Sequence, residues 1–311
     1  MIVLLAGGVG GAKLAEGLYH LLPPEELTII VNVGDDEEFH GLHVSPDIDI
    51  VIYTLAGIVD ESRGWGIKGD SFNCLEQLGV YGHETWFRIG DRDMATHIHR
   101  TMLLRSGRKL HEAVDDIRRK LGVRCRILPA TDDRLRTMVE TTEGTMTLQE
   151  YFVKHGTGPE VKDVWYEGEG EAEPAPGVIE AIESSQAVVI APSNPILSIR
   201  PILAVKGIEE TLEKGGKPAV AVSPLIGGRA VKGPADRMMR SMGLPPNPHT
   251  IAKLYQPFLT DLVIDAQDRE YGDRIEATGV RVHITETLMK SREDKVRLAH
   301  YICSSILGMK L

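Results

Sequence analysis

The chain begins with Met1-Ile-Val-Leu-Leu-Ala-Gly7-Gly8-Val9-Gly10-Gly11-Ala-Lys13. The apolar run before the glycines predicts a short buried strand, and leucines at helical spacing after Lys13 predict an amphipathic helix. Glycines in the turn between them allow the backbone to approach a ligand closely. Because the first amides of a helix have no partner within it and lie at its positive dipole end, this strand–turn–helix unit indicates a site for a nucleotide or another phosphate ester.

The glycine turn matches neither of the two common phosphate-binding motifs strictly. The dinucleotide fingerprint requires a third glycine where this chain has Lys13, and the P-loop requires glycine before the lysine, where Ala12 stands. The alternative interpretation is a tight turn in an α/β sheet that binds no ligand, with Lys13 as a solvated helix residue.

The composition of the 311 residues is that of an ordinary globular protein, with 42% hydrophobic and 26% charged residues. The formal net charge of −10 argues against a protein that coats nucleic acid. The three cysteines form no CxxC pair, which fits a reducing cytoplasm and excludes a disulfide framework. No apolar run approaches the ~20 residues of a membrane span. We therefore expect a cytoplasmic protein that binds neither membranes nor nucleic acid.

The order of predicted elements indicates an α/β fold. The strand Leu27–Val33 follows the first helix, and a strand–helix–strand unit of this length requires parallel strands. Strands and helices alternate again in the second half of the chain, with strands at 187–191, 219–222, 262–265 and 280–284. We predict a doubly wound, mostly parallel Rossmann-like sheet formed by residues 1–130 and 177–311. The short β-like runs and small helix of residues 131–176 predict an inserted smaller α+β subdomain.

Several predicted strands end in small, polar or acidic residues. In a doubly wound sheet the ligand crevice lies at the carboxyl ends of the strands, at the point where the strand order reverses. We expect four loops to gather there: Gly7–Gly11, Asn32–Asp36, Ser193–Asn194 and Ser223–Gly228.

A group of carboxylates belongs to this predicted crevice. Asp35 and Asp36 follow the second strand, and Asp47 and Asp49 begin the next helix. Clustered carboxylates beside a phosphate site are oxygen ligands suited to Mg²⁺. For Asp47 alone, capping of the helix N-terminus is an interpretation of at least equal weight.

Two further motifs offer polar contacts. Arg88 and Arg92 flank Gly90-Asp91 and are able to form forked hydrogen bonds to a phosphate or carboxylate, although surface ion pairs with the neighbouring aspartates are the alternative. Ser193-Asn194 lies between prolines that stiffen the loop, and its side chains suit a phosphate or a base. A plain strand-to-helix turn is the alternative there.

The sequence contains no nucleophile relay, since there is no GxSxG elbow and no cysteine–histidine pairing. This absence favours a reaction that depends on positioning and charge neutralisation, such as phosphoryl transfer.

The motifs, taken in order, closely resemble those of the 2-phospho-L-lactate transferase family of coenzyme F(420) biosynthesis. The resemblance extends from Met1 to the C-terminal helix, and the ordered set is specific although each motif alone is not. The segments that carry it are Gly7–Lys13, Asn32–Asp36, His40–Asp49, Arg63–Gly66, Gly90–His97, Ala191–Pro195 and Ser223–Gly227.

The resemblance implies a phosphotransferase-type reaction that requires Mg²⁺. A 2-phospholactyl group passes from lactyl-(2)-diphospho-(5′)-guanosine to the terminal ribityl hydroxyl of the deazaflavin Fo, 7,8-didemethyl-8-hydroxy-5-deazariboflavin. The products are coenzyme F(420)-0 and GMP. Similar bacterial enzymes use a phosphoenolpyruvyl donor, so the donor acid stays open. The assembly also stays open, and a homodimer is one of the states that the sequence allows.

The resemblance also suggests roles for individual residues. Asp35 and Asp49 are the expected catalytic residues and metal ligands nearest the reacting centre. Asp49, Arg88 and Arg92 are expected to contact the deazaflavin. Trp65 is expected to stack on its ring, with packing within its own loop as an alternative of equal weight. The residues expected to bind the diphosphate or the guanosine are Gly8, Gly10, Gly11, Lys13, Ser193 and Asn194.

Two other function classes compete with this interpretation. Nucleotide-sugar-binding regulatory proteins of the same fold share the glycine turn and the paired aspartates, and a test of Fo binding separates them from a transferase. An NAD-dependent dehydrogenase is disfavoured by Lys13 in place of glycine. It is also disfavoured because the pair Asp35-Asp36 after Gly34 replaces a lone acidic residue.

Overall fold

A seven-stranded sheet forms the centre of the computed structural model, which describes residues 1–311. The strand order is β14-β13-β10-β9-β1-β2-β5, and every neighbouring pair is parallel. This confirms the predicted doubly wound α/β fold, with a central sheet that is parallel throughout. Its strands are β1 (Ile2–Ala6), β2 (Leu27–Val31), β5 (Arg126–Pro129), β9 (Ala187–Ile190), β10 (Ala219–Val222), β13 (Asp261–Asp265) and β14 (Arg281–Thr285).

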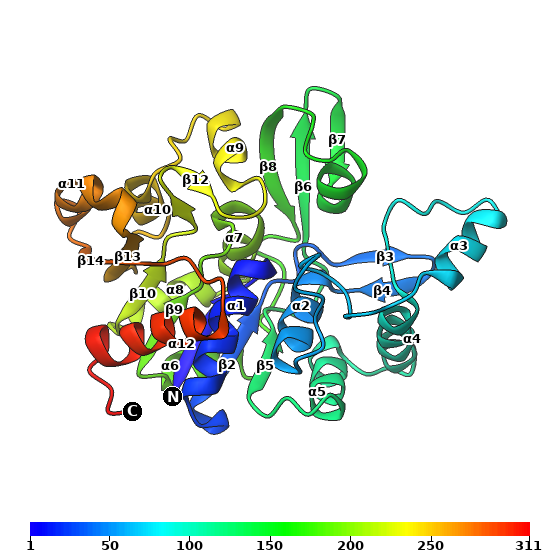
Figure 1. The fold of residues 1–311 in the computed structure, drawn as a ribbon, viewed down its shortest axis with the longest axis horizontal. Coiled ribbons are helices and arrows are strands. Elements are labelled where there is room, and N and C mark those ends of the chain that lie inside the picture. The colour runs from blue at the N-terminus through cyan, green and yellow to red at the C-terminus, as the bar shows by residue number, and fades with distance from the viewer.

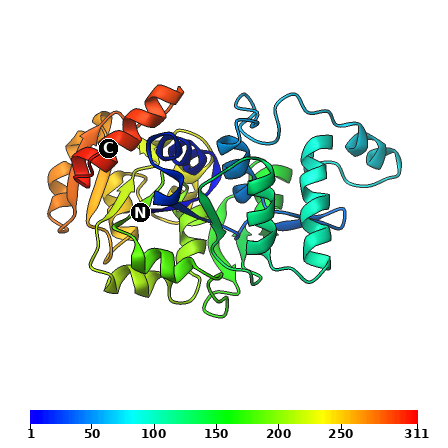
Figure 2. The ribbon, with the colours of Figure 1, turned by 90° about the horizontal axis from the view of Figure 1, so that it is seen from below.

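The central strands are continuous apolar runs because helices cover both faces of the sheet. Every residue of β1 and of β2 is buried, and Ile2 pairs with Leu27 on one side and with Ala187 on the other. Figure 2 shows α1 (Gly8–Leu21) and α12 (Arg292–His300) together on one face, with α6 (Val178–Ser184) and α8 (Ile208–Lys214) on the opposite face.

The remaining helices lie around this sheet (Figure 1). They are α2 (Pro46–Leu55), α3 (Asn73–Val80), α4 (Asp91–Arg105), α5 (Leu110–Lys120), α7 (Arg200–Leu203), α9 (Ala235–Ser241), α10 (Pro248–Leu254) and α11 (Gly272–Glu276). No helix is long and apolar enough to cross a membrane, and all three cysteines are free.

The strand order reverses between β1 and β9. From β1 the chain proceeds through β2 to the edge strand β5, and it then returns to β9 on the other side of β1 and proceeds through β10 and β13 to β14. The loops that follow β1 and β9 therefore lead away in opposite directions, which leaves a crevice at the carboxyl ends of the strands. The glycine turn after β1 lies at this point.

Two smaller structures extend beyond the central sheet (Figure 1). An antiparallel sheet of order β7-β6-β8 lies within residues 131–176, the segment predicted as an insertion. Its strands are β6 (Arg136–Thr141), β7 (Gly144–Thr147) and β8 (Val161–Glu167), and a helical turn, Glu150–Lys154, follows β7. The hairpin β3 (Glu37–Phe39)–β4 (Leu42–Val44) projects on another side, near α3.

The sequence pattern missed the hairpin, α3 and the strand β8. Both hairpin strands are three residues long, and only Val161 and Tyr166 of β8 are buried. Elements that are very short, like the hairpin strands, or mostly exposed, like β8, lack the hydrophobic periodicity from which strands are predicted.

Candidate active site

A cavity of about 570 Å³ lies at the carboxyl ends of the central strands, at the reversal of strand order. All four predicted loops contribute to its lining, which confirms that they converge. The residues from these loops are Gly7, Gly8, Val9, Gly10, Asp35, Ser193, Asn194, Ser223, Pro224 and Ile226.

The glycine turn is shaped by close contacts with two neighbouring loops. A Cβ atom at Gly7 would lie 2.4 Å from an Asp47 carboxylate oxygen, and one at Gly10 would lie 2.2 Å from the carbonyl oxygen of Pro192. Gly8 has φ +62°, a left-handed conformation that favours glycine. The Gly8 amide donates to Asp47 Oδ1 at 2.7 Å. The turn therefore holds the start of α1 directly against an acidic side chain.

Ser193 and Asn194 both contact the backbone. Ser193 Oγ donates to the Gly7 carbonyl at 2.7 Å and accepts from the Gly7 amide at 3.2 Å, so this hydroxyl fixes the glycine turn. Asn194 Oδ1 accepts from the amides of Ile196 and Leu197, which begins the next helical turn. The Asn194 Nδ2 atom is buried without a partner in the protein, and its residue lines the cavity. Asn194 thus retains a donor for a ligand.

Asp35 and Asp47 form a buried acidic pair beside the glycine turn. The side chain of Asn32 bridges them, since its Nδ2 donates to Asp47 Oδ2 at 2.9 Å and lies 3.4 Å from Asp35 Oδ1. Burial and the nearby charge of Asp47 raise the pKa of Asp35 well above its ordinary value. Burial raises the pKa of Asp47 to about 6, although hydrogen bonds from Asn32 and Gly8 oppose this shift. No lysine or arginine neutralises either carboxylate within ion-pair distance.

This acidic pair fits a magnesium ion. No group of three or more His, Cys, Asp and Glu side chains is arranged to hold a metal ion. Mg²⁺, however, is commonly held by one or two carboxylates together with substrate phosphates. A cation there would neutralise two neighbouring buried carboxylates that have no other cationic partner.

Asp49, the other predicted metal ligand, faces a different partner. Both of its carboxylate oxygens pair with the fully buried guanidinium of Arg100, and His97 Nδ1 lies 3.6 Å away. Asp49 lines the cavity, but Arg100 neutralises its charge. The sequence did not decide whether Asp47 caps α2 or binds a ligand. In the structure it is the aspartate that lies beside Asp35. The residue at the N-cap position of α2 is Ser45.

The pairing of Arg100 with Asp49 was not predicted, although the sequence of α4 contains a signal for it. Asp93, His97 and Arg100 recur at positions i, i+4 and i+7 of α4, so they share one helix face. All three are buried, His97 Nε2 lies 3.3 Å from Asp93, and the Tyr53 hydroxyl donates to Asp93 at 2.8 Å. A polar stripe of this kind on a helix indicates a buried hydrogen-bond network.

The residues predicted to contact the deazaflavin separate into two groups. Arg88 and Trp65 line the cavity, with the Arg88 guanidinium 4.4 Å from the centre of the Phe72 ring and Trp65 39% exposed. Arg92 is exposed, does not line the cavity, and donates to the Lys68 carbonyl at 3.3 Å. The structure therefore brings Arg88 and Trp65, but not Arg92, to the site.

An apolar wall completes one half of the cavity, and no sequence motif indicated it. It combines residues from β4, from α2, from the loop before α4 and from residues 148–153 of the insertion. Phe87 stacks on Phe39 with ring centres 3.9 Å apart, so the β3–β4 hairpin supports the wall. The wall residues are Val44, Ile50, Trp86, Phe87, Leu148, Phe152 and Val153.

Lys13 lies at the other half of the cavity. Its Nζ donates to the carbonyl of Met289 at 2.8 Å, and it forms no ion pair with a carboxylate. Burial lowers the pKa of Lys13, and the neighbouring ammonium groups of Lys295 and Lys232 lower it further. This half is also lined by Pro224, Ile226, Val231, Lys232 and Leu288, from the loops that follow β10 and β14.

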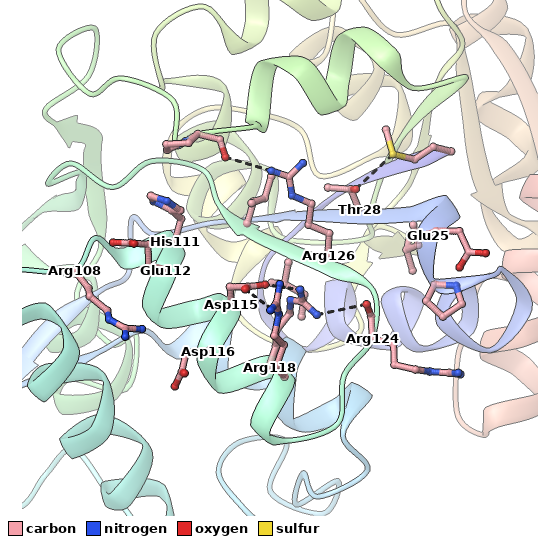
Figure 3. A pocket seen from close by; sticks show the side chains of 17 residues that line it. Glu25, Thr28, Arg108, His111, Glu112, Asp115, Asp116, Arg118, Arg124 and Arg126 are labelled. Atoms are coloured by element: carbon pink, nitrogen blue, oxygen red, sulfur yellow. Dashed lines mark hydrogen bonds and ion pairs between the residues drawn. The ribbon is translucent and has the colours of Figure 1, made fainter.

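A second cavity, of about 730 Å³, lies at the amino ends of β2 and β5, away from the reversal of strand order (Figure 3). Its charged side chains mostly satisfy one another or the backbone. Arg118 pairs with Asp115 and donates to the carbonyl of Val123, and Arg126 donates to the carbonyl of Pro176. The candidate active site is therefore the cavity at the carboxyl ends.

Comparison with known proteins identifies the family. Residues 2–300 match the family described as 2-phospho-L-lactate transferase CofD. A 2-phospho-L-lactate transferase from Methanopyrus kandleri is 42% identical over 305 residues, covering 97% of this chain and 96% of the relative. A phosphoenolpyruvate transferase from Streptomyces griseus is 40% identical, covering 93% of this chain and 92% of the relative.

A solved structure shares the fold across the whole chain. This crystal structure of a UPF0052 family member from Bacillus halodurans is 18% identical and superposes with a TM-score of 0.62, covering 97% of this chain and 98% of that chain. The family match covers the whole of the glycine turn, the acidic pair and the cavity lining described above. The chain therefore belongs to the 2-phospho-L-lactate transferase CofD family.

Proposed function

We propose that this chain transfers the 2-phospholactyl group of lactyl-(2)-diphospho-(5′)-guanosine to Fo, giving coenzyme F(420)-0 and GMP. The observation that supports this most is that one cavity is lined by two unlike groups of side chains together with the glycine turn and the acidic pair. One group is the apolar aromatic wall, and the other contains Lys13 and residues that follow β9 and β10. A reaction between a flat acceptor and a nucleotide diphosphate needs such an arrangement.

The apolar half suits the deazaflavin. Planar rings bind best between hydrophobic and aromatic surfaces, with a few polar groups to fix their orientation. Trp86, Phe87 and Phe152 supply that surface, and Arg88 and Trp65 stand at its edge. In this arrangement the ribityl chain extends from the wall toward Asp35 and Asp47.

The other half suits the guanosine diphosphate portion of the donor. The amides at the start of α1 and the Lys13 ammonium provide positive charge for the diphosphate. The unpartnered Asn194 Nδ2 provides a further donor. We assign Gly8, Gly10, Lys13 and Asn194 to the donor. The predicted diphosphate residue Gly11 is buried against Ser193 and does not line the cavity, so we assign Gly11 and Ser193 to the support of the turn.

The transfer is an in-line displacement. A bond forms between the ribityl oxygen and the phosphorus that carries the lactyl group, and the bond from that phosphorus to the oxygen that leaves with GMP breaks. The proton of the hydroxyl passes to water, and GMP leaves with the electron pair of the broken phosphorus–oxygen bond. The groups of this chain position the two substrates and neutralise charge on the leaving GMP, with Lys13 nearest the diphosphate.

We propose that the reaction requires Mg²⁺ held by Asp35 and Asp47. When bound there, the ion would neutralise negative charge on the diphosphate oxygens. Asp49 belongs to the acceptor side, where its pairing with Arg100 fixes the position of its carboxylate against α4.

The test is an assay of the purified chain with Mg²⁺, Fo and either the phospholactyl or the phosphoenolpyruvyl donor. We expect release of GMP and a phosphorylated deazaflavin with the phospholactyl donor. A preference for the phosphoenolpyruvyl donor would change the donor acid and keep the reaction class. Absence of GMP release with both donors, together with no change in Fo fluorescence on addition of the protein, would instead favour a nucleotide-binding regulator.

A further inference from the structure

Two loops from distant parts of the sequence meet above the start of α1. One is the loop 60–66 that contains Trp65, and the other follows the short hairpin of β11 (Leu225–Ile226) and β12 (Arg229–Ala230). Lys232 in the second loop donates from Nζ to the carbonyl of Arg63 at 3.0 Å, across 169 residues of sequence. This is a contact that no sequence motif predicted.

Gly64 makes room for the Lys232 ammonium. Its φ is +75°, and a Cβ atom there would lie 1.8 Å from Lys232 Nζ and 3.6 Å from a methyl group of Val9. The Lys232 ammonium therefore lies against the Gly64 backbone, close to Val9 of the glycine turn. Lys232 also lines the same cavity as Lys13.

Lys13 and Lys232 are two ammonium groups without a carboxylate partner in one cavity. Each donates one hydrogen bond to a backbone carbonyl, of Met289 and Arg63 respectively, and neither forms an ion pair. An ammonium carries three donors, so each keeps two for a ligand. Burial lowers the pKa of both lysines, and the charges of Lys295 and Lys232 lower that of Lys13 further. A bound anion would offset this accumulation of positive charge.

We propose that Lys232 is a second diphosphate-binding lysine, which contacts the donor from the loop side of the cavity while Lys13 contacts it from α1. This inference rests on the proposed function, because it assumes a guanosine diphosphate donor in that half of the cavity. Lys232 thereby selects a nucleotide that carries a diphosphate over one that carries none. Through its hydrogen bond to the Arg63 carbonyl, Lys232 also connects the loop that contains Trp65 to the donor site.

The test is the binding of GDP and of guanosine to the full chain with Mg²⁺, measured by titration calorimetry for the wild type and for Lys232→Met. A hydrogen bond between charged groups corresponds to about a tenfold or greater change in affinity. We expect Lys232→Met to weaken GDP binding by about tenfold or more and to leave guanosine binding within about twofold. Lys232→Arg should restore most of the GDP affinity.

Lys253→Met is the matched control, because Lys253 is exposed on α10, forms no ion pair and lies outside the cavity. It removes the same charge and should leave both affinities unchanged. If Lys232→Met weakened the binding of GDP and of guanosine equally, Lys232 would only hold the two loops together, and the inference would be wrong. Unchanged GDP binding would also overturn it. Failure of the wild-type chain to bind GDP would overturn the proposed donor itself, and the inference with it.

Discussion

A buried ion pair between Asp49 and Arg100 joins α2 to α4. We expect its loss to lower the free energy of unfolding substantially. Arg100→Met keeps an unbranched apolar side chain but removes the guanidinium group, which leaves the Asp49 carboxylate, 5% exposed, without that cation. Removing one partner of a buried pair costs about 3–5 kcal/mol of unfolding free energy. The Arg100 Nε atom is buried without a partner, and methionine removes that penalty. We therefore expect Arg100→Met to lower the free energy of unfolding by about 3 kcal/mol, at the lower end of that range.

The assay is urea unfolding followed by far-ultraviolet circular dichroism, without substrates. Asp49→Asn, which leaves Arg100 charged and facing an amide, should also destabilise the protein. The double variant contains neither charge of the pair, so its loss of unfolding free energy should be smaller than the sum of the two single losses by at least about 1 kcal/mol.

Arg119→Met provides the control for the loss of an arginine. Arg119 is 70% exposed and pairs with Asp115 on the surface of α5, so its removal should cost no more than about 0.5 kcal/mol. Two results would contradict the buried pairing of Asp49 with Arg100. One is a loss of unfolding free energy below about 1 kcal/mol for Arg100→Met, and the other is a double variant whose loss equals the sum of the two single losses.

Three further predictions concern the site and the acid stability of the fold. Asp47→Asn keeps an acceptor for the Gly8 amide but removes one carboxylate of the acidic pair. The rate of Mg²⁺-dependent GMP release should therefore fall by at least about a hundredfold, with an unchanged circular dichroism spectrum. A variant that keeps more than a tenth of the wild-type activity would contradict this role. Arg88→Met should raise the KM for Fo by about tenfold or more, whereas Arg92→Met, outside the cavity, should leave it within about twofold; equal effects of the two changes on steady-state kinetics would reject the placement of the acceptor. Burial alone would raise the pKa of Asp261, but hydrogen bonds from the neighbouring histidine, arginine and threonine lower it to about 2. Because its folded-state pKa lies below the ordinary value of 3.8, this carboxylate stabilises the fold above about pH 4, and that contribution, about 2 kcal/mol, is lost as the pH falls toward 2. Urea unfolding between pH 5 and pH 2.5 should therefore show a shallower loss of stability for Asp261→Asn than for the wild type, and parallel curves would contradict the assignment.

Most of the central sheet could be predicted from the sequence, because strands buried on both faces are continuous apolar runs bounded by glycines and acidic residues. The ends of the predicted strands at 187–191, 262–265 and 280–284 differ from the observed ends by one residue. The pattern failed where elements are short and exposed, as in the β3–β4 hairpin, because no buried face imposes a periodicity on them.

The site was predicted in part. The four loops could be placed together from the sequence alone, since the carboxyl ends of parallel strands lie on one edge of a sheet. The apolar wall could not be predicted, because Val44, Trp86 and Phe152 come from three segments that only the packed fold brings together. Lys232 was missed for the same reason, since its partner Arg63 lies in a loop 169 residues away.

The sequence by itself determined the strand–turn–helix unit, the parallel sheet and the gathering of polar loops at one edge, because hydrophobic periodicity and glycine conformation are local properties. Only the tertiary structure decided which carboxylate stands with Asp35. Asp47 and Asp49 are two residues apart in α2, and a helix of 3.6 residues per turn places such side chains about 200° apart around its axis. They cannot face the same point, and the packing of α2 between the glycine turn and α4 directs Asp47 to Gly8 and Asp49 to Arg100.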